Sequence, residues 1–463
     1  MTAVVMTTVG MQRNSPRIWL EGRKLEREGF RPEVTYRLDD SRSDSLTLVA
    51  AADGDRVVSG RKRQAYRAPI IDIANKILYR WFKNGETVRI VIRRRRIKIS
   101  VRRHRASEQV ADRVRRLTTK LKNNQPLSIY SLFHGGGILD KALHSGLERA
   151  GIKSRVDVAV EMNSRYMDVS IDRHPELFSE STIFIEGKIQ DVWLGDLPHA
   201  DILVCGLPCT GASKAGRTKN KLAKAEDHPE AGALFYYFLD WVRRSNPGAV
   251  LLENVPELIS TATMAAIRNV LESFGYIIQE RIVSGTFFGS LEARKRLCMV
   301  AITEGMESGF DLASVEPIYR KPDRLGVALD DVPLDADVWR TYSYLTAKEE
   351  RDKADGKGFR MQIFTPDDSE IKTLTSRYHK GGSTDPLIAH PNDPQKRRKI
   401  SRFEHAKIKG IDVSYVEGPE MTETLGHEVM GQGVTPGAFE AVAADLGKAF
   451  IASVQEEPEA LVA

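Results

Sequence analysis

Hydrophobic and polar residues follow two different rhythms along this 463-residue chain. After Pro126, short apolar runs such as LSIYSLF, VDVAVEM, DILVCGL and AVLLENV are separated by stretches with helical spacing, such as LDKALHSGLERAG and TMAAIRNVLESFGY. Such runs are typical of strands buried on both faces, and their alternation with helices is typical of a mostly parallel sheet. We therefore expect residues 126–304 to form an α/β domain.

The segment before Pro126 has a shorter rhythm. Residues 1–15 are polar and are expected to form a frayed tail. From Arg17 the pattern predicts a strand, a turn of helix ending at Gly29 and two further strands, and this order recurs in PIIDIANKILYRWF, ETVRIVI and RRIKISV. We expect residues 1–101 to be a β-rich basic domain with a weak internal duplication of about 40 to 50 residues.

Two further regions complete the organisation. Residues 102–125 are basic and carry apolar residues at helical spacing, which predicts a helical linker. The apolar rhythm breaks after Thr303, so residues 305–398, rich in Asp, Pro and Gly, are expected to form a smaller separate region. Helical segments within residues 399–455 then return to the α/β domain.

Composition and charge narrow the class of protein. No apolar run approaches the roughly 20 residues of a membrane-spanning helix, and the N-terminus lacks the order of a secretory signal, so we expect a cytoplasmic protein. Three cysteines cannot build a disulfide framework, and no Cys/His spacing indicates a metal site. The net charge is +6, but residues 1–125 hold 30 basic and 13 acidic residues.

This charge asymmetry indicates a polyanionic partner. The runs Arg93-Arg94-Arg95-Arg96 and Arg102-Arg103-His104-Arg105 would release counterions from a nucleic-acid backbone, which gives salt-dependent affinity with little sequence preference. The alternative is a solvated basic face that has no partner.

A glycine-rich turn is the first segment that carries chemistry. Gly135 to Gly137 lie between an apolar strand and a helix, where the backbone can approach a bound nucleotide or nucleoside closely. Glu161 ends the next strand, where a carboxylate can accept hydrogen bonds from ribose hydroxyls. A simple tight turn and a solvated carboxylate remain the alternatives for these two features.

The segment DILVCGLPCTGAS presents a thiol at the carboxyl edge of the predicted sheet. Pro208 fixes the backbone, and Cys209 follows on a loop where it can act as a nucleophile. Cys205 and Cys298 fall inside strands and are interpreted as core residues. Glu253 ends a later strand, where a carboxyl group can donate a proton to a ring nitrogen.

Arginine pairs and a glycine-flanked basic segment provide candidate substrate contacts. Arg294 and Arg296 are two residues apart, a spacing that places both on one face of a strand and would clamp a phosphate or carbonyl oxygen. In TLTSRYHKGGS, Arg377 and Lys380 are candidates for contacts to a phosphate or a guanine edge. A plain flexible loop is the alternative for this segment.

The order FHGGG, Glu161, GLPC, ENV, EARKR and GQGV (Gly431 to Val434) resembles the ordered motif set of the DNA cytosine-5 methyltransferases over about residues 127–452. Each motif alone is weak, whereas the ordered set is specific. The resemblance implies a Rossmann-like methyltransferase fold that uses S-adenosylmethionine, with residues 305–398 as a target-recognition region and double-stranded DNA as substrate. It also implies a restriction enzyme or phage context, a monomer and a nucleoid-associated location.

The resemblance also implies roles for individual residues. Cys209 would add to C6 of a flipped-out cytosine while Glu253 assists at N3. Arg294 and Arg296 would position the base, and Pro208 and Asn254 would support the active-site loop and contact substrate, with Arg377 and Lys380 on the DNA. The cofactor would be surrounded by Phe133, Gly135, Gly137, Glu161, Pro208, Gly431, Gly433 and Val434.

Departures from the family pattern concern the surroundings of the cofactor. The family usually has Asp at Ser131, Gly at Ile138, Gln at Thr210 and Glu292, Ser at Gly433 and a cofactor-facing Asp at Lys188. An RNA cytosine-5 methyltransferase and a DNA-binding regulator with an inactive methyltransferase domain are the alternative functions. The N-terminal region weakly resembles AbrB-like and SymE-type swapped-hairpin DNA-binding domains, which would provide extra grip on DNA or promoter repression.

Overall fold

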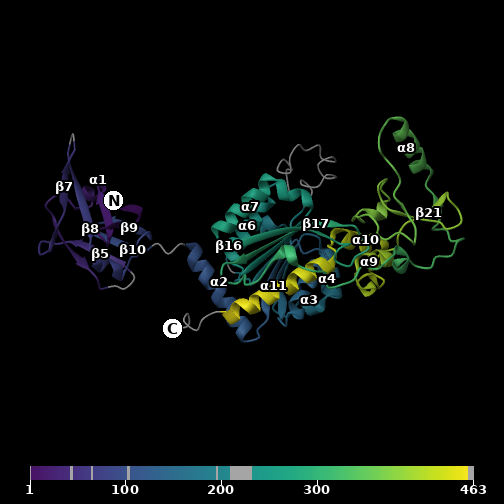
Figure 1. The fold of residues 1–463 in the computed structure, drawn as a ribbon, viewed down its shortest axis with the longest axis horizontal. Coiled ribbons are helices and arrows are strands. Elements are labelled where there is room, and N and C mark those ends of the chain that lie inside the picture. Colours follow the sequence, from purple (N-terminus) through teal and green to yellow (C-terminus); the bar gives the residue numbers. More distant parts are fainter. Residues whose placement is uncertain are drawn as a thin grey trace. The chain divides into compact units, whose positions relative to one another are not determined.

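The structure is a computed structural model that describes residues 2–41, 45–63, 66–101, 105–193, 195, 197–208 and 232–456. The chain divides into two compact units, Met1–Glu108 and Gln109–Ala463 (Figure 1). Within the described part of the chain, no helix is both long and apolar enough to cross a membrane.

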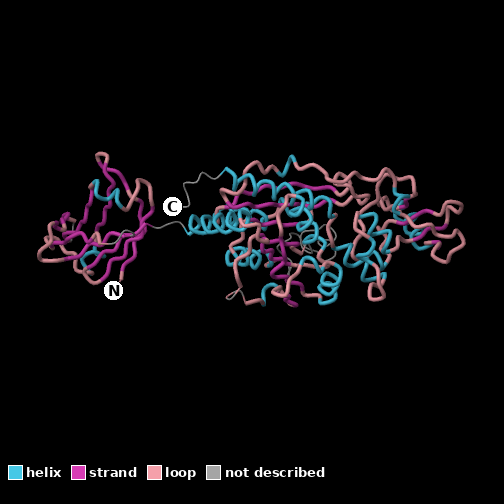
Figure 2. The backbone as a smooth tube through the Cα atoms, turned by 90° about the horizontal axis from the view of Figure 1, so that it is seen from below, coloured by secondary structure: helices cyan, strands magenta, loops and turns pink. Residues whose placement is uncertain are grey.

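The Met1–Glu108 unit consists mainly of strands (Figure 2). One sheet has the order β1-β9-β10-β5-β4-β6 and the other the order β2-β3-β8-β7. The elements are β1 (Ala3–Thr8), β2 (Gly10–Gln12), β3 (Ser15–Glu21), α1 (Arg23–Arg27), β4 (Thr35–Asp39), β5 (Ser45–Ala50), β6 (Arg56–Val57), β7 (Ser59–Lys62), β8 (Arg67–Ala74), the 3-10 helix η1 (Lys76–Arg80), β9 (Thr87–Arg93) and β10 (Arg96–Val101). Apolar residues from both sheets form one core.

The strand order of this unit is two-fold symmetric. Two pairs of equivalent strands meet at the centres of the sheets, β3 with β8 and β5 with β10. At the two edges of the six-stranded sheet, β1 pairs with β9 in the same way as β6 pairs with β4. The sequence β3, α1, β4, β5 therefore recurs as β8, η1, β9, β10. Two similar halves each contribute strands to both sheets, in keeping with the weak repeat in the sequence.

The first residues of the chain belong to this sheet, so the expectation of a frayed tail for residues 1–15 is wrong. Strand β1 pairs antiparallel with β9 over six residue pairs, from Ala3 with Ile92 to Thr8 with Thr87. Val9, which follows, is buried in the core. The segment looked unstructured because an edge strand pairs on one side only and leaves alternate side chains in solvent.

The Gln109–Ala463 unit is built on a seven-stranded sheet with the order β13-β12-β11-β14-β15-β17-β16. Strands β11 to β15 are parallel, and β16 and β17 are antiparallel at one end. The strands are β11 (Leu127–Leu132), β12 (Ser154–Glu161), β13 (Ile183–Glu186), β14 (Ile202–Gly206), β15 (Ala249–Asn254), β16 (Tyr276–Ser284) and β17 (Lys295–Thr303).

Helices cover both faces of this sheet (Figure 1). On one face, α3 (Ile138–Arg149), α4 (Ser164–Arg173) and α11 (Pro436–Glu456) pack into a core with alternate residues of the strands. On the other face, α6 (Leu234–Ser245) and α7 (Ala262–Ser273) form a second core. This three-layer arrangement, with both faces of a largely parallel sheet buried, confirms the predicted Rossmann-like α/β fold.

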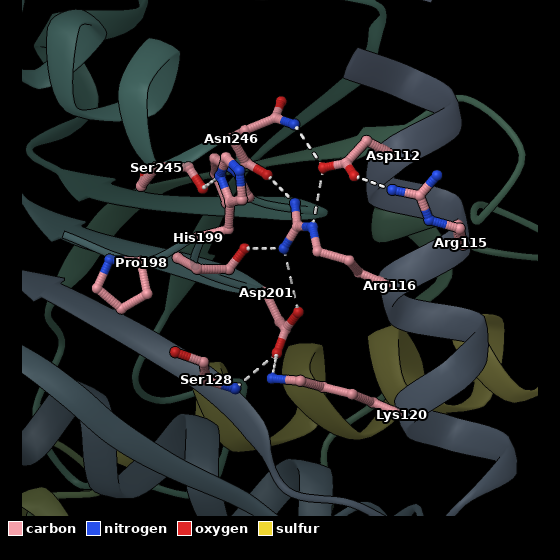
Figure 3. A network of polar contacts seen from close by, with 12 residues as sticks. Asp112, Arg115, Arg116, Lys120, Ser128, Pro198, His199, Asp201, Ser245 and Asn246 are labelled. Atoms are coloured by element: carbon pink, nitrogen blue, oxygen red, sulfur yellow. Dashed lines mark hydrogen bonds and ion pairs between the residues drawn. The ribbon is translucent and has the colours of Figure 1, made fainter. Parts of the chain in front are cut away.

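Helix α2 (Arg105–Lys122) occupies the segment interpreted as a linker, and one side of it packs into the α/β core through Val114, Leu117 and Leu121. Leu117 is fully buried, and the Arg113 guanidinium donates to Thr303 Oγ1 over 2.9 Å. Arg116 and Lys120 both contact the carboxylate of Asp201, which is itself fully buried (Figure 3). A buried carboxylate with two cationic partners ties this helix to the α/β unit.

Residues after β17 complete the unit. Met306, Phe310 and Val315 still pack into the α11 side of the sheet. A small four-stranded sheet then forms with its own core. Its elements are β18 (Arg340–Thr341), α8 (Ser343–Ala354), β19 (Ile363–Phe364), β20 (Leu387–Ala389) and β21 (Lys396–Arg398), and the chain returns through α9 (Arg402–Lys409) and α10 (Glu423–Gln432).

Candidate functional site

The strand order places a topological switch point between β11 and β14. From β11 the chain proceeds outward to β12 and β13, and from β14 it proceeds in the opposite direction to β15. In open α/β sheets, ligands bind outside the carboxyl ends of the strands at such a point. The glycine-rich loop follows β11 and the Pro208 segment follows β14, so the two candidate motifs flank the switch point.

The glycine-rich loop has the backbone conformation that its sequence predicts. Gly135 and Gly137 have φ values of 59° and 79°, and Gly137 caps the N-terminus of α3. Phe133 also has a positive φ, of 58°, which is unusual for a residue with a bulky side chain and is typical of functional sites. A Cβ atom at Gly135 would meet nothing within 4 Å, so the backbone is open to a ligand there.

Glu161 is fixed beside this loop by the main chain. One carboxylate oxygen accepts the backbone N–H of Gly135 and the other accepts that of Asn163, each over 2.9 Å. Both bonds leave lone pairs on the carboxylate, so it can accept further hydrogen bonds from a diol. The next residue, Met162, exposes 73% of its surface at the end of the same strand. A single Met belongs to no recognisable sequence motif, so this residue could not be identified from the sequence.

The ENV motif anchors the start of the loop that leads to Cys209, the candidate nucleophile. The side-chain amide of Asn254 is buried and donates to the carbonyl of Leu207 over 2.8 Å. Pro208 follows directly and is half-buried. Cys209 itself lies outside the described residues. The support that the resemblance assigns to Asn254 therefore has a direct physical form, a hydrogen bond to the residue two positions before the thiol.

Glu253 lies beside this loop at the carboxyl edge of the sheet. Its backbone is paired with Gly206 in the parallel ladder between β15 and β14. The Arg296 guanidinium forms an ion pair with this carboxylate, with 2.9 Å between Arg296 Nε and Glu253 Oε1, and the side chains of Glu253 and Arg296 expose 13% and 16% of their surface. An ion pair with this little exposure restricts the orientation of the carboxylate.

Arg294 and Arg296 contact different parts of the site in the interactions that the structure describes, although the sequence spacing predicts both on one face of a strand. Strand β17 begins at Lys295, so Arg294 precedes it. The Arg294 guanidinium is buried and donates to the carbonyls of Gly431 and Gln432 over 3.1 and 3.2 Å. Arg296 contacts the Glu253 carboxylate, whereas Arg294 holds the distant GQGV segment.

A second cation holds the same segment, and the sequence reasoning did not identify it. Lys409 donates to the carbonyl of Gly433 over 3.1 Å and to Glu292 Oε2 over 2.8 Å. The other oxygen of Glu292 accepts the backbone N–H of Leu374. Burial lowers the pKa of Lys409, and the charge of Lys409 lowers the pKa of Glu292 against the opposing effect of burial.

The GQGV residues have different surroundings. Gly431 lies against the backbone of Thr375 and Ser376, where a Cβ atom would come within 2.2 Å of the Ser376 nitrogen. Gly433 is half-buried at the end of α10, and Val434 is buried in the α11-side core. Only Gly433 retains exposed surface among these three residues, so Gly431 and Val434 shape the turn.

The candidate recognition segment exposes its basic residues around a buried anchor. Tyr378 is fully buried, donates to the carbonyl of Pro386 over 2.7 Å and accepts the N–H of Ile400. Arg377 and Lys380, on either side, are exposed. This arrangement presents two cations outward from a rigid turn.

The two remaining cysteines are core residues, as the sequence predicts. Cys205 and Cys298 are both fully buried. Burial raises the pKa of Cys205 well above its usual value and that of Cys298 to about 12. Neither thiol can ionise near neutral pH. Among the described residues, no cluster of three or more His, Cys, Asp or Glu side chains is placed to hold a metal ion.

Two related sequences resemble the α/β unit. The chain is 28% identical over 266 residues to the Type II methyltransferase M1.ScrFI of Lactococcus lactis subsp. cremoris, which covers 56% of this chain and 64% of that protein. It is 25% identical over 268 residues to the Type II methyltransferase M.SsoII of Shigella sonnei, and this match covers 56% of this chain and 67% of that protein. The chain thus spans just under two thirds of the first relative.

Solved structures share the fold at low sequence identity. The Entamoeba histolytica methyltransferase EhMeth is 16% identical, with a TM-score of 0.54 over 70% of this chain and 98% of its own. The S. pombe Dnmt2 methyltransferase is 17% identical, with a TM-score of 0.51 over 69% and 98%. A family model described as C-5 cytosine-specific DNA methylase matches residues 127–448. Since this match covers well over half of the chain, the protein belongs to the C-5 cytosine-specific DNA methylase family.

Proposed function

We propose that this chain transfers a methyl group from S-adenosylmethionine to C5 of a flipped-out cytosine in double-stranded DNA. The observation that carries the proposal is the placement of the Glu253–Arg296 pair beside Gly206, the residue that ends β14 and leads to Pro208 and Cys209. The pair holds the Glu253 carboxyl group next to the loop that bears the candidate nucleophile Cys209. The substrate class, cytosine in DNA, is inferred from the membership of the chain in the C-5 cytosine-specific DNA methylase family.

The residues near the switch point fit S-adenosylmethionine. Glu161 offers oriented carboxylate oxygens for ribose hydroxyls, and the open backbone at Gly135 leaves room for the nucleoside. Met162 offers an exposed apolar surface for the adenine ring, while Phe133, Gly137 and Pro208 border the same region. When bound, the cofactor supplies an electrophilic methyl group.

The residues of the chain would perform the remaining steps on the base. The Cys209 thiolate adds to C6 of cytosine, and Glu253 donates a proton to N3, so that electron density moves to C5. After C5 has been methylated, transfer of the C5 proton to solvent, return of the N3 proton to Glu253 and elimination of the Cys209 thiolate restore the aromatic ring. Arg296 keeps the Glu253 carboxyl directed at the base throughout.

The segment around Tyr378 offers candidate contacts for recognition of the DNA. Arg377 and Lys380 are exposed beside a buried anchor, and we assign them to the DNA phosphates or a guanine edge. Extrusion of the base would distort the duplex at a cost of a few kcal/mol. The relatives are named Type II methyltransferases, which supports a role in Type II modification.

Bisulfite sequencing of plasmid DNA from expressing cells tests the proposal. Cytosines protected in one recurring context by the intact chain, and unprotected with Cys209→Ala, are the expected result. Glu253→Gln should reduce turnover by a factor of about 10² or more while duplex binding remains nearly unchanged, because glutamine cannot donate the proton but keeps the size and shape of the glutamate side chain. Methylation of RNA and not DNA by the intact chain would instead select the RNA alternative.

A further inference from the structure

The solvent-exposed face of the six-stranded sheet in the Met1–Glu108 unit is strongly basic. Its cations come from the neighbouring strands β9 and β10, from the hairpin turn between them, and from β4, which β5 separates from β10. We call them the basic face: Arg37, Arg89, Arg93, Arg94, Arg95, Arg96 and Lys98. The opposite side of the same strands, including Ile90, Ile92, Ile97 and Ile99, is fully buried. The alternation of the strands therefore separates core from charge cleanly.

The register places these cations in rows across the sheet. Arg93 on β9 lies opposite Arg96 on β10, Arg96 lies opposite Val49 on β5, and Val49 lies opposite Arg37 on β4. With strands about 4.8 Å apart, this row spans about 14 Å. The next cations along the face are Lys98 and Arg89. A row of this length is similar to the roughly 12 Å width of the DNA major groove.

Charge is not balanced on this face. Six of the residues in the basic face are well exposed and Lys98 is half-buried. None of the seven forms an ion pair with any residue that the structure describes, whereas Arg17, Arg63, Arg67 and Arg80 of the same unit each have a carboxylate partner. The register also places Asp39 on this face, where hydrogen bonds from Ser41 and the nearby charges of Arg37 and Arg96 lower the pKa of its carboxyl group.

The hairpin between β9 and β10 carries its arginines at an energetic cost. Arg94 and Arg95 have φ values of 47° and 58°, the conformation of a two-residue type I′ turn, which favours Asn-Gly. Arg93 and Arg96 lie directly opposite each other, and like charges in this position destabilise a sheet. A fold selected for stability alone would use other residues at all four positions.

The turn is also held rigidly. The N–H of Arg94 donates to the Glu28 carboxylate and the N–H of Arg95 to the Glu28 carbonyl, each over 2.9 Å. The corresponding hairpin of the other half, between β4 and β5, begins with Asp39 and Asp40. The two halves thus share a topology, and the arginine turn belongs to the second half, whereas residues 42–44 of the other hairpin lie outside the described residues.

We propose that the basic face binds the phosphate backbone of double-stranded DNA without sequence preference. The exposed guanidiniums, which form no ion pair within the described part of the chain, match the regular negative charge of a duplex, and a rigid turn loses little conformational entropy on binding. This interaction would hold the chain on DNA independently of the methyl-transfer site. Arg102, Arg103 and His104, the other basic run in the sequence, lie outside the described residues.

The test uses the full chain with the substitutions Arg94→Asn and Arg95→Gly. Asn-Gly is the preferred type I′ sequence, so the double variant should fold at least as well as the intact protein while losing two charges. Its matched control is Arg67→Gln with Arg80→Gln, which removes the same charge from exposed residues that have carboxylate partners. The probe is a fluorescent duplex of A·T pairs only, which contains no cytosine and cannot be a methylation substrate.

We expect the slope of log K against log salt concentration to become shallower by about 2 for the turn variant, and its affinity near 0.15 M salt to fall about ten- to thirty-fold. The control should retain the intact slope. Methyl transfer at saturating concentrations of a cytosine-containing duplex should be unchanged, which separates this proposal from the proposed function. If the turn variant does not fold, Arg93→Thr with Arg96→Thr tests the same face with strand-compatible residues.

Three results would overturn the proposal. An unchanged slope in the turn variant would mean that the basic face does not contact DNA. An equal loss in the control would mean that total charge, and not this face, governs binding. Tighter binding of a double-stranded RNA of the same length, with a loss confined to RNA in the turn variant, would assign the face to RNA.

Discussion

Replacing Lys409 with methionine should destabilise the Gln109–Ala463 unit by about 3 to 5 kcal/mol. Lys409 and Glu292 are both fully buried, with 2.8 Å between their charged atoms. The substitution removes the cation and leaves the Glu292 carboxylate in the interior. Its remaining partners are the Leu374 N–H and the Arg294 guanidinium, which is 3.8 Å away.

Replacing the other partner, by Glu292→Gln, should lower the free energy of unfolding less than Lys409→Met does. Burial already lowers the pKa of Lys409, so without the carboxylate this side chain can lose its proton instead of remaining as an isolated buried charge. A neutral amine still donates to the Gly433 carbonyl. The double variant contains no buried charge at either position, so it should be more stable than Lys409→Met alone.

Lys407→Met is the matched control. Lys407 lies on the same helix and pairs with Asp330, but both side chains are more than one-third exposed, so its loss should cost less than about 1 kcal/mol. Urea unfolding followed by circular dichroism reports on this unit, since the long helices belong to it. The reasoning is refuted if Lys409→Met costs no more than the control, or if adding Glu292→Gln makes it worse.

Three further predictions concern packing and ionisation. Deleting residues 1–104 should leave the α/β unit folded, whereas deleting 1–125 should lower its stability by more than about 3 kcal/mol in thermal melts, because the buried Asp201 carboxylate loses both α2 cations. Cys298, whose pKa burial raises to about 12, should resist alkylation until the protein unfolds, as mass spectrometry would reveal. Burial lowers the pKa of His174 to about 4, below its unfolded value of 6.5, so the unfolded state binds more protons between these two pH values. The free energy of unfolding should therefore fall by about 2 kcal/mol from pH 7 to pH 5. This fall should be absent in His174→Phe.

The interior of the α/β fold could be predicted because its strands are buried on both faces. Every residue of β11 is buried, so the strand is a continuous apolar run in the sequence. Edge strands carry no such signal. Strands β1 and β13 mix exposed and partly buried residues, and β16 has buried residues only near its two ends, so the hydrophobic pattern did not identify these strands. Edge strands are recognised by their pairing partners, which a local pattern does not contain.

The candidate site divides in the same way. Residues that would perform chemistry, such as Glu253 and Glu161, stand at the ends of strands in short recognisable motifs. Residues that hold the motifs in place have no local signature. Tyr415 donates to the carbonyl of Gly136 across 279 positions, and its role follows from the fold alone.

Glu292 shows how a departure from a family pattern can be explained by a second residue. The family usually has an uncharged Gln at this position, and in this chain the position is fully buried. A carboxylate there would be strongly destabilising without a cation, because desolvation of an unpaired charge costs several kcal/mol. Lys409, 117 residues later, supplies that cation and also holds the Gly433 carbonyl. The substitution and its compensation therefore form one unit that couples the arginine motif to the C-terminal turn, and neither residue is intelligible from the sequence without the other.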